Sequence, residues 1–270
     1  MPPHWTGTIQ PVTVGLSVCK MASMSQPLIE IINRKYVNNT PGTRAPRPVD
    51  ASSIVLIDRR DGEPRFLMGR RNPAARFMPG FFVFPGGRVE KGDADVPYSG
   101  SLDAHDLGRL MQFVTRPTER RMRGLALAAI RELFEETGLR LSVRTSETPR
   151  PSGNPVWAEF EDGGHIPTLD GMRLLARAVT PPGRPRRFDT RFFVRDMNGD
   201  TDLTTIRPTP DSELVELRWV TFSEARGLDT AEITQMILSD LKVQIEAGLP
   251  VDQPRPYYRL RHRRFERVVF

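Results

Sequence analysis

The sequence has very little cysteine: Cys19 is the only one among 270 residues. A single cysteine excludes an intramolecular disulfide and a zinc site built from several thiolates. Such sparse use of cysteine fits a reducing compartment, and we therefore expect the protein to be cytoplasmic.

Long apolar runs are also missing. No uncharged apolar stretch reaches the ~18 residues that a membrane-spanning helix needs. The first two dozen residues are mildly apolar but lack the basic start of a secretory signal, so we expect no signal peptide. Met21 and Met24 are alternative starts that the sequence leaves open. These absences predict a protein without a membrane partner.

The composition is that of a soluble, basic, globular protein. Aromatic residues make up only 8% of the chain, hydrophobic residues 38% and charged residues 27%. The net charge of +6 favours anionic partners, which include phosphorylated small molecules and nucleic acids. The basic residues are mostly scattered, and the basic and aromatic run of residues 257–267 is short. We therefore expect a small-molecule substrate and no nucleic-acid partner.

Composition also divides the chain. Residues 1–48 are predicted to be a flexible leader, in which Pro41, Pro46 and Pro48 alternate with Gly42 and basic residues and only Leu28–Val37 could form a short helix. Residues 49–250 are predicted to form one domain, and residues 251–270 a basic C-terminal tail. The oligomeric state stays open, a homodimer included.

Periodicity predicts strands and helices in alternation. The first strands, Ser52–Ile57 and Arg65–Arg70, are joined by a turn containing Asp61-Gly62. Residues 145–171 are rich in proline, glycine and acids, which predicts a loop. Further strands are predicted over Phe81–Phe84, Leu141–Val143, Met172–Val179 (or a short helix), Phe188–Val194 and Glu213–Val220. Helices are predicted over Leu102–Phe113 with Ser101 as N-cap, Thr118–Thr137, Phe222–Leu228 and Thr230–Glu246.

The helix capped by Thr118 carries an unusual acidic cluster. Glu132, Glu135 and Glu136 share one face, because residues spaced i, i+3 and i+4 are neighbours on a helix. Each like-charge pair costs about 0.2–0.5 kcal/mol, and the dipole at the helix end disfavours each anion by roughly 0.3–1 kcal/mol. Three glutamates on a helix are usually a solvated face. Here their unfavourable placement favours retention for a hard divalent cation, which prefers oxygen ligands.

Upstream of this helix lies a glycine turn. The stretch from Phe84 to Asp93 reads Phe-Pro-Gly-Gly-Arg-Val-Glu-Lys-Gly-Asp and follows an apolar, strand-like run. Gly86 and Gly87 allow the backbone to turn tightly and to approach phosphate groups closely.

With both stretches in view, the chain resembles the Nudix hydrolases. Their sequence box reads G-x5-E-x7-R-E-U-x-E-E-x-G-U, in which U is a bulky aliphatic residue. The second half matches without a gap from Arg131 to Leu139, and the first half matches from Gly87, with Asp93 in place of the first glutamate. The resemblance implies an α/β Nudix fold, in which a mixed β-sheet is sandwiched between α-helices.

The box is interrupted between its halves. Between Asp93 and Arg131 lie 37 residues, against 7 in the family pattern, so 30 residues are inserted, with the insert at about 94–118. A similar interruption, after a similar Phe-Met-Pro-Gly…Phe-Pro-Gly-Gly lead-in, is a feature of the branch resembling peroxisomal coenzyme A diphosphatases. Because both ends of the insert are expected near the phosphate site, we expect it to shape the pocket for the rest of the substrate, such as a pantetheine arm.

The resemblance also implies roles for single residues. Glu135 and Glu136 would be the main ligands of Mg²⁺ or Mn²⁺, and Glu132 a further ligand. Arg131 would orient this cluster by ion pairing. Asp93 is shorter than the usual glutamate and precedes the insert, so we do not expect it to act through the helix.

The general base and the phosphate contacts are less defined. Glu213 is ranked before Glu216 as the late acid, because it lies at the end of a loop, and Glu132 is the other candidate base. The candidates for phosphate contacts are Arg70, Arg187 and Arg191, each of which is otherwise read as a surface residue.

The implied function is metal-dependent hydrolysis of a nucleoside diphosphate linked to another group, X, with coenzyme A or an acyl-coenzyme A favoured. The Leu-Arg-x-His-x-Gly stretch of another coenzyme A-cleaving Nudix group is absent, so ADP-ribose, NADH and dinucleoside polyphosphates remain alternatives. A non-catalytic nucleotide-sensing Nudix module is the rival of another class.

Overall fold

The protein folds around one mixed β-sheet. A computed structural model describes residues 25–37, 45–75, 77–146, 153–184, 186–197, 206–210 and 212–270. Seven strands follow the order β11-β10-β7-β8-β1-β2-β3, while β4 pairs with β1 and β9 with β2. The strands are β1 (Val49–Asp58), β2 (Arg65–Arg71), β3 (Phe82–Val83), β4 (Gly86–Arg88), β7 (Arg173–Val179), β8 (Phe188–Asp196), β9 (Leu214–Val220), β10 (Pro256–Arg261) and β11 (Arg264–Val269).

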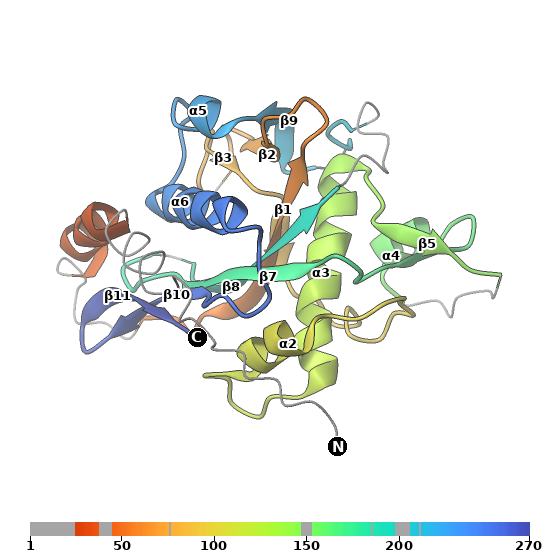
Figure 1. Cartoon of the computed structure of the whole chain (residues 1–270), viewed down its shortest axis with the longest axis horizontal. Helices are drawn as coiled ribbons and strands as arrows, with labels where there is room; N and C mark the ends of the chain where they lie inside the picture. The colour runs from red at the N-terminus through yellow and green to blue at the C-terminus, as the bar shows by residue number, and fades with distance from the viewer. Residues whose placement is uncertain are drawn as a thin grey trace, which may run out of the picture.

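Helices lie on both faces of this sheet (Figure 1). On one face are α2 (Ala104–Met111), α3 (Glu119–Thr137) and α4 (Pro155–Phe160), and on the other are α6 (Glu232–Glu246) and the helix of residues 25–32. A π-helical turn, η1 (Asn33–Val37), continues the latter, and α5 (Phe222–Ala225) follows β9. The expected sheet between helices is therefore confirmed.

Strand β1 supplies side chains to both cores. Ile54 and Leu56 pack in the core under α3, whereas Val55 and Ile57 pack in the core under α6, and all four are fully buried. Successive side chains of a strand point to opposite faces, so a continuous apolar run suits a strand covered on both sides.

β1 also changes partners along its length, and this positions the glycine turn. One edge pairs in parallel with β8 from Val49 to Ile57. The other edge pairs antiparallel with β4 at residues 51–53 and with β2 at residues 57–58. The change of partner brings Gly86–Arg88 beside the C-terminal half of α3.

The two ends of the described chain pack on the domain. Ser25 Oγ lies 3.1 Å from Tyr258 Oη, and Asn33 exchanges two hydrogen bonds with the backbone of Phe265. Strand β10 pairs in parallel with β7, so the β10–β11 hairpin extends the sheet. Residues 25–37 and 256–269 thus belong to the folded domain, which corrects the expected leader and tail. The remainder of the expected leader before residue 25 lies outside the described residues.

Two local expectations differ from the structure. Residues 145–171 are not one loop, because they contain α4 and β6 (His165–Pro167), which pairs with β5 (Ser142–Arg144) in a separate two-stranded sheet. The Asn154 side chain caps α4, and the Trp157 and Phe160 side chains of this helix are buried. The cap and this burial stabilise a helix in a stretch whose composition predicts a loop. Asp103, rather than Ser101, caps α2. No helix in the described part of the chain is both long and apolar enough to cross a membrane.

Candidate active site

The acidic residues stand near the C-terminal end of α3, as predicted. Thr118 caps the helix by accepting a hydrogen bond from the Arg121 backbone N–H at 3.2 Å. Gly138 ends it in the left-handed conformation at φ 72°, and its N–H donates to the Phe134 carbonyl. The 19 residues make a rigid rod about 28 Å long.

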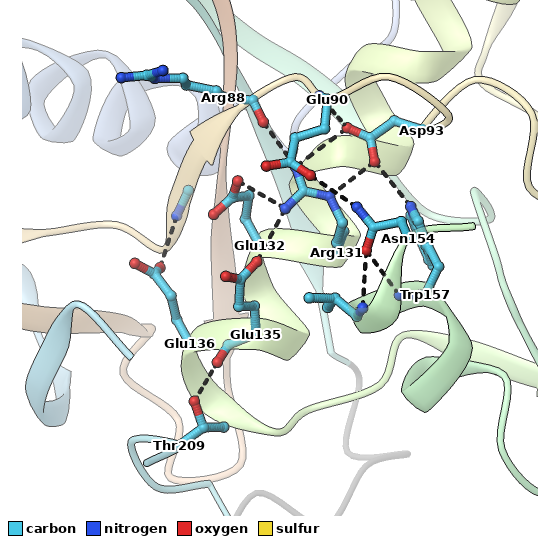
Figure 2. Close-up of polar contacts among 12 residues, drawn as sticks. Arg88, Glu90, Asp93, Arg131, Glu132, Glu135, Glu136, Asn154, Trp157 and Thr209 are labelled. Carbon is cyan, nitrogen blue, oxygen red and sulfur yellow. Dashed lines mark hydrogen bonds and ion pairs between the residues drawn. The ribbon is translucent and has the colours of Figure 1, made fainter. Parts of the chain in front are cut away.

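Arg131 is the centre of an ion-pair cluster (Figure 2). Its Nη1 lies 3.0 Å from both Glu132 Oε1 and Glu135 Oε2, and its Nη2 donates to the Arg88 carbonyl at 2.8 Å. Burial alone would lower the pKa of Arg131, but the hydrogen bond to Asp93 and the surrounding carboxylates outweigh it and raise the pKa. The guanidinium therefore stays charged and pairs with both carboxylates.

Asp93 is the second partner of Arg131. Its Oδ1 accepts from Arg131 Nε at 2.8 Å and from Trp157 Nε1 at 2.9 Å, and its Oδ2 accepts from the Glu90 backbone N–H at 2.7 Å. Both charged side chains are almost completely buried. The expectation that Asp93 would not act through the helix is wrong. The turn after β4 lays residues 88–95 along α3, so the insert follows this contact and does not separate its partners.

Glu132 and Glu136 are buried acids with raised pKa values. Burial raises the pKa of Glu132 to about 7, although the charge of Arg131 opposes it. Burial also raises the pKa of Glu136, and the charge of Glu132 adds to this shift, while a 3.0 Å hydrogen bond from Gly86 N–H counteracts it. Two neighbouring carboxylates that desolvation disfavours in their charged form can be stabilised by a cation.

The glycine turn lies directly against these acids. Gly86 adopts φ 156°, and a Cβ atom there would fall 2.4 Å from the Ser52 carbonyl oxygen. A Cβ atom on Gly87 would fall 2.5 Å from Glu132 Oε2. Only glycine at both positions lets the backbone approach strand β1 and the Glu132 carboxylate this closely.

These groups line one cavity of about 470 Å³, a volume typical of small-molecule sites. Glu132, Glu135 and Glu136 line it, together with Gly86 and Gly87. Glu213 also lines the cavity and forms an ion pair with Arg71, whereas Glu216 pairs with Arg70 and Arg218 and is not among the lining residues.

The three arginines expected to contact phosphate lie outside the cavity lining. Arg70 lies 3.7 Å from Glu216, and Arg187 donates to the backbone carbonyls of Thr180 and Pro46. Arg191 is 1% exposed and pairs with Asp50 and Asp189. These contacts explain the three side chains as structural cations.

Sequence reasoning missed four other arginines. Those that line the cavity are Arg71, Arg88, Arg184 and Arg186. A signal existed for Arg71, because strand periodicity places it on the opposite face from Arg70. Arg184 and Arg186 lie in the turn before β8, where the sequence pattern does not predict the direction of a side chain.

The insert does not line the cavity at any residue from Ala94 to Thr118, which corrects its expected role in shaping the pocket. Thr118 is 14 residues before Glu132 on a straight helix, so the second end of the insert lies about 21 Å from the acids. α2 instead packs between α3 and β7, where the buried Asp106 carboxylate accepts hydrogen bonds from Arg173 Nε and Leu174 N–H.

The donor groups fit a hard divalent cation in kind. Glu132, Glu135 and Glu136 offer only carboxylate oxygens, which Mg²⁺ and Mn²⁺ prefer. Within the described residues, no three acidic or histidine side chains converge closely enough to form a complete cation site. Arg131 pairs with two of the three carboxylates, those of Glu132 and Glu135.

The known proteins that this chain is similar to are named as Nudix hydrolases. No family model matches the chain. A Caenorhabditis elegans protein that carries the name nudix hydrolase 7 is 30% identical over an alignment of 182 residues, which covers 63% of this chain and 50% of that protein. The chain thus spans about half the length of this curated relative.

The fold is also similar to that of a solved structure. The Nudix hydrolase of Alicyclobacillus acidocaldarius superimposes with a TM-score of 0.54 and 24% sequence identity, covering 74% of this chain and 96% of the other. Together with the mixed sheet between helices and the acidic helix beside the glycine turn, this similarity establishes that the chain has the Nudix fold.

Proposed function

We propose that the protein hydrolyses the diphosphate of a nucleoside diphosphate linked to a second group, X, and that coenzyme A or an acyl-coenzyme A is its substrate. The observation that carries the proposal is the arrangement of Glu132, Glu135 and Glu136 around Arg131, beside the glycine turn and inside one cavity. A binding module would not need buried acids whose pKa values are raised by their surroundings. This favours an enzyme over a nucleotide sensor.

The residues divide the work as follows. Glu132, Glu135 and Glu136 would hold the divalent ion, which when bound supplies charge neutralisation of the diphosphate and a more acidic water. Arg131 positions Glu132 and Glu135, and Asp93 fixes Arg131 from the other side. The rigid helix keeps the three acids in register with the glycine turn.

Glu213 is the favoured general base. It lines the cavity from the position just before β9, its side chain is 68% exposed, and Arg71 pairs with it. An exposed carboxylate beside the cavity can be reached by an attacking water, and its pairing with Arg71 holds it in place. Glu132 remains the alternative, because its pKa of about 7 also suits proton exchange near neutral pH.

The interrupted box and the Phe77–Gly87 lead-in support coenzyme A as the substrate. ADP-ribose, NADH and dinucleoside polyphosphates are the competing substrates, since the three glutamates and their metal ion would act on every diphosphate alike. Turnover of this panel with Mg²⁺ or Mn²⁺ separates them. We expect the coenzyme A compounds to have the highest kcat/KM, and a preference for ADP-ribose would replace the substrate assignment.

Metal binding is tested separately by thermal melting. Millimolar Mg²⁺ or Mn²⁺ should raise the melting temperature, because a ligand that binds only the folded state stabilises it by mass action. Glu135→Gln should remove most of this shift. Glu119→Gln is the matched control on the same helix, where Glu119 is exposed and pairs with Arg123. An equal shift in wild type and Glu135→Gln would argue against metal ligation at this site.

A further inference from the structure

One buried tryptophan is not among the residues that line the cavity and is still connected to the acidic cluster. Trp157, on α4, is fully buried, and its indole Nε1–H donates to Asp93 Oδ1 at 2.9 Å. The same oxygen accepts the 2.8 Å hydrogen bond from Arg131 Nε. Figure 2 shows how the contacts continue from Arg131 to Glu132 and Glu135. The indole thus reaches two of the three carboxylates through Asp93 and Arg131.

The Asp93 carboxylate is held by four hydrogen bonds. Besides the two on its Oδ1, its Oδ2 accepts from the Glu90 backbone N–H at 2.7 Å and from Arg131 Nη2 at 3.3 Å. A carboxylate has about four lone-pair sites, so these donors use its whole acceptor capacity. Arg131 and the turn itself provide three of them, and Trp157 brings the fourth from a separate helix. Because hydrogen bonds to a carboxylate are strong and directional, this fourth donor fixes the rotation of Asp93.

The indole is itself fixed to the helix that carries the acids. The Phe160 ring meets the Trp157 ring edge to face with centroids 5.2 Å apart, and it meets the Phe134 ring of α3 in the same way at 5.3 Å. A path of contacts that begins on α3 at Phe134 therefore returns to α3 at Arg131, by way of Trp157 and Asp93. A closed path of buried contacts leaves its members little freedom to move, because packed side chains occupy single rotamers.

We propose that Trp157 is a positioning residue of the metal site. Its indole N–H fixes Asp93, and Asp93 in turn fixes the guanidinium of Arg131. Arg131 then keeps Glu132 and Glu135 ready to receive the ion. Outer contacts of this kind strengthen metal binding, because ligands that are already oriented need less reorganisation. The inference rests on the proposed function for the identity of the metal ligands, and it gives α4 a part in the site.

The test makes the same substitution at two tryptophans. Trp157→Phe keeps a ring in the core and removes the N–H that Asp93 accepts. Trp219→Phe is the matched control on β9, because the Trp219 N–H is buried without a hydrogen-bond partner among the described residues. The affinity of the full-length protein for Mn²⁺ is measured from the electron paramagnetic resonance signal of the free ion, at a temperature where circular dichroism shows both variants folded. Trp157→Phe should weaken binding about five- to tenfold, and Trp219→Phe less than about twofold.

An isostere separates the N–H from the packing of the ring. Replacement of Trp157 by 3-benzothienylalanine puts sulfur in place of the indole N–H and keeps nearly the same shape, so the core stays filled even where Trp157→Phe does not fold. The isostere should weaken Mn²⁺ binding as much as Trp157→Phe does. Equal or tighter binding in the isostere, or an equal loss in Trp219→Phe, would overturn the proposed role of the Trp157 N–H.

The same titrations check the metal site on which the inference rests. Mn²⁺ binding to wild type that Glu135→Gln abolishes supports both the site and the inference. The absence of such binding in wild type would reject the metal site and the role of Trp157 together. Normal binding in wild type, with unchanged affinity in both replacements of Trp157, would reject the role of Trp157 alone, so the two failures can be told apart.

Discussion

Arg131 brings one positive charge into a group of carboxylates. Two aspartates close in sequence, Asp93 and Asp95, show how much burial changes the energy of an ion pair. The Arg131–Asp93 pair is almost completely buried, whereas Asp95, two residues later, pairs with Arg120 at the surface with more than half of each side chain exposed. Removing one partner of a buried pair leaves the other charge unpaired in a poorly solvated place, while an exposed pair contributes little.

Asp93→Asn should therefore lower the free energy of unfolding by about 3 kcal/mol. Asp95→Asn, the matched control, should change it by less than about 1 kcal/mol. Urea denaturation of both variants measures the difference. Similar losses in the two variants would show that the Asp93 contact does not have the weight that its burial suggests.

The late acids give a second residue-scale prediction. If Glu213 is the general base, Glu213→Gln should lower kcat about 10²–10⁴-fold and leave the metal-dependent melting shift unchanged. Glu216→Gln, three residues later on β9 and outside the cavity lining, should retain nearly full activity. A loss in Glu213→Gln below about threefold would transfer the role to Glu132.

The sequence predicts those features of an element that depend only on residues nearby in the chain. The Thr118 cap, the Gly138 end and the faces of α3 were predicted, because capping and helical spacing depend only on nearby residues. The contact of Asp93 with Arg131, the cavity arginines and the packed α4 were not predicted. Each depends on partners far along the chain, which composition and periodicity do not identify.

The same substitution should have opposite effects at two helix positions. Gly138→Ala places a side chain at φ 72° and should destabilise the fold by about 1 kcal/mol, although no atom lies within 4 Å of the new Cβ. Gly108→Ala in α2 also meets open space but has ordinary helical backbone, so it should stabilise by about 0.5–1 kcal/mol. Thermal denaturation of both variants checks the signs, and a loss of stability in Gly108→Ala would contradict this account.

At the scale of the whole molecule, one buried acid joins α6 to the C-terminal hairpin. Asp240 accepts hydrogen bonds from Tyr258 Oη at 2.6 Å and from Arg267 Nη2 at 3.1 Å. Burial raises the pKa of Asp240 to about 6, although the charge of Arg267 opposes the shift. The hairpin therefore attaches to the domain through a group that titrates just below neutral pH.

This gives a prediction for pH. Between about pH 4 and 6 the folded state retains a proton on Asp240 that the unfolded state has already released, so this group's contribution to stability decreases as pH rises. Asp240→Asn removes the contribution. The stability of Asp240→Asn relative to wild type should therefore increase from pH 4 to pH 7 in urea denaturation. A difference that stays constant over this range would contradict the raised pKa.

The contact between the two chain ends also sets an order of events during synthesis. Ser25 emerges from the ribosome 233 residues before its partner Tyr258, and Asn33 must wait for Phe265 in the same way. Helix α3, which carries the acids, can pack on β1 much earlier, because both are complete by residue 137. A nascent chain stopped before β10 should thus hold the acidic cluster in place while the N-terminal helix lacks its contacts with Tyr258 and Phe265.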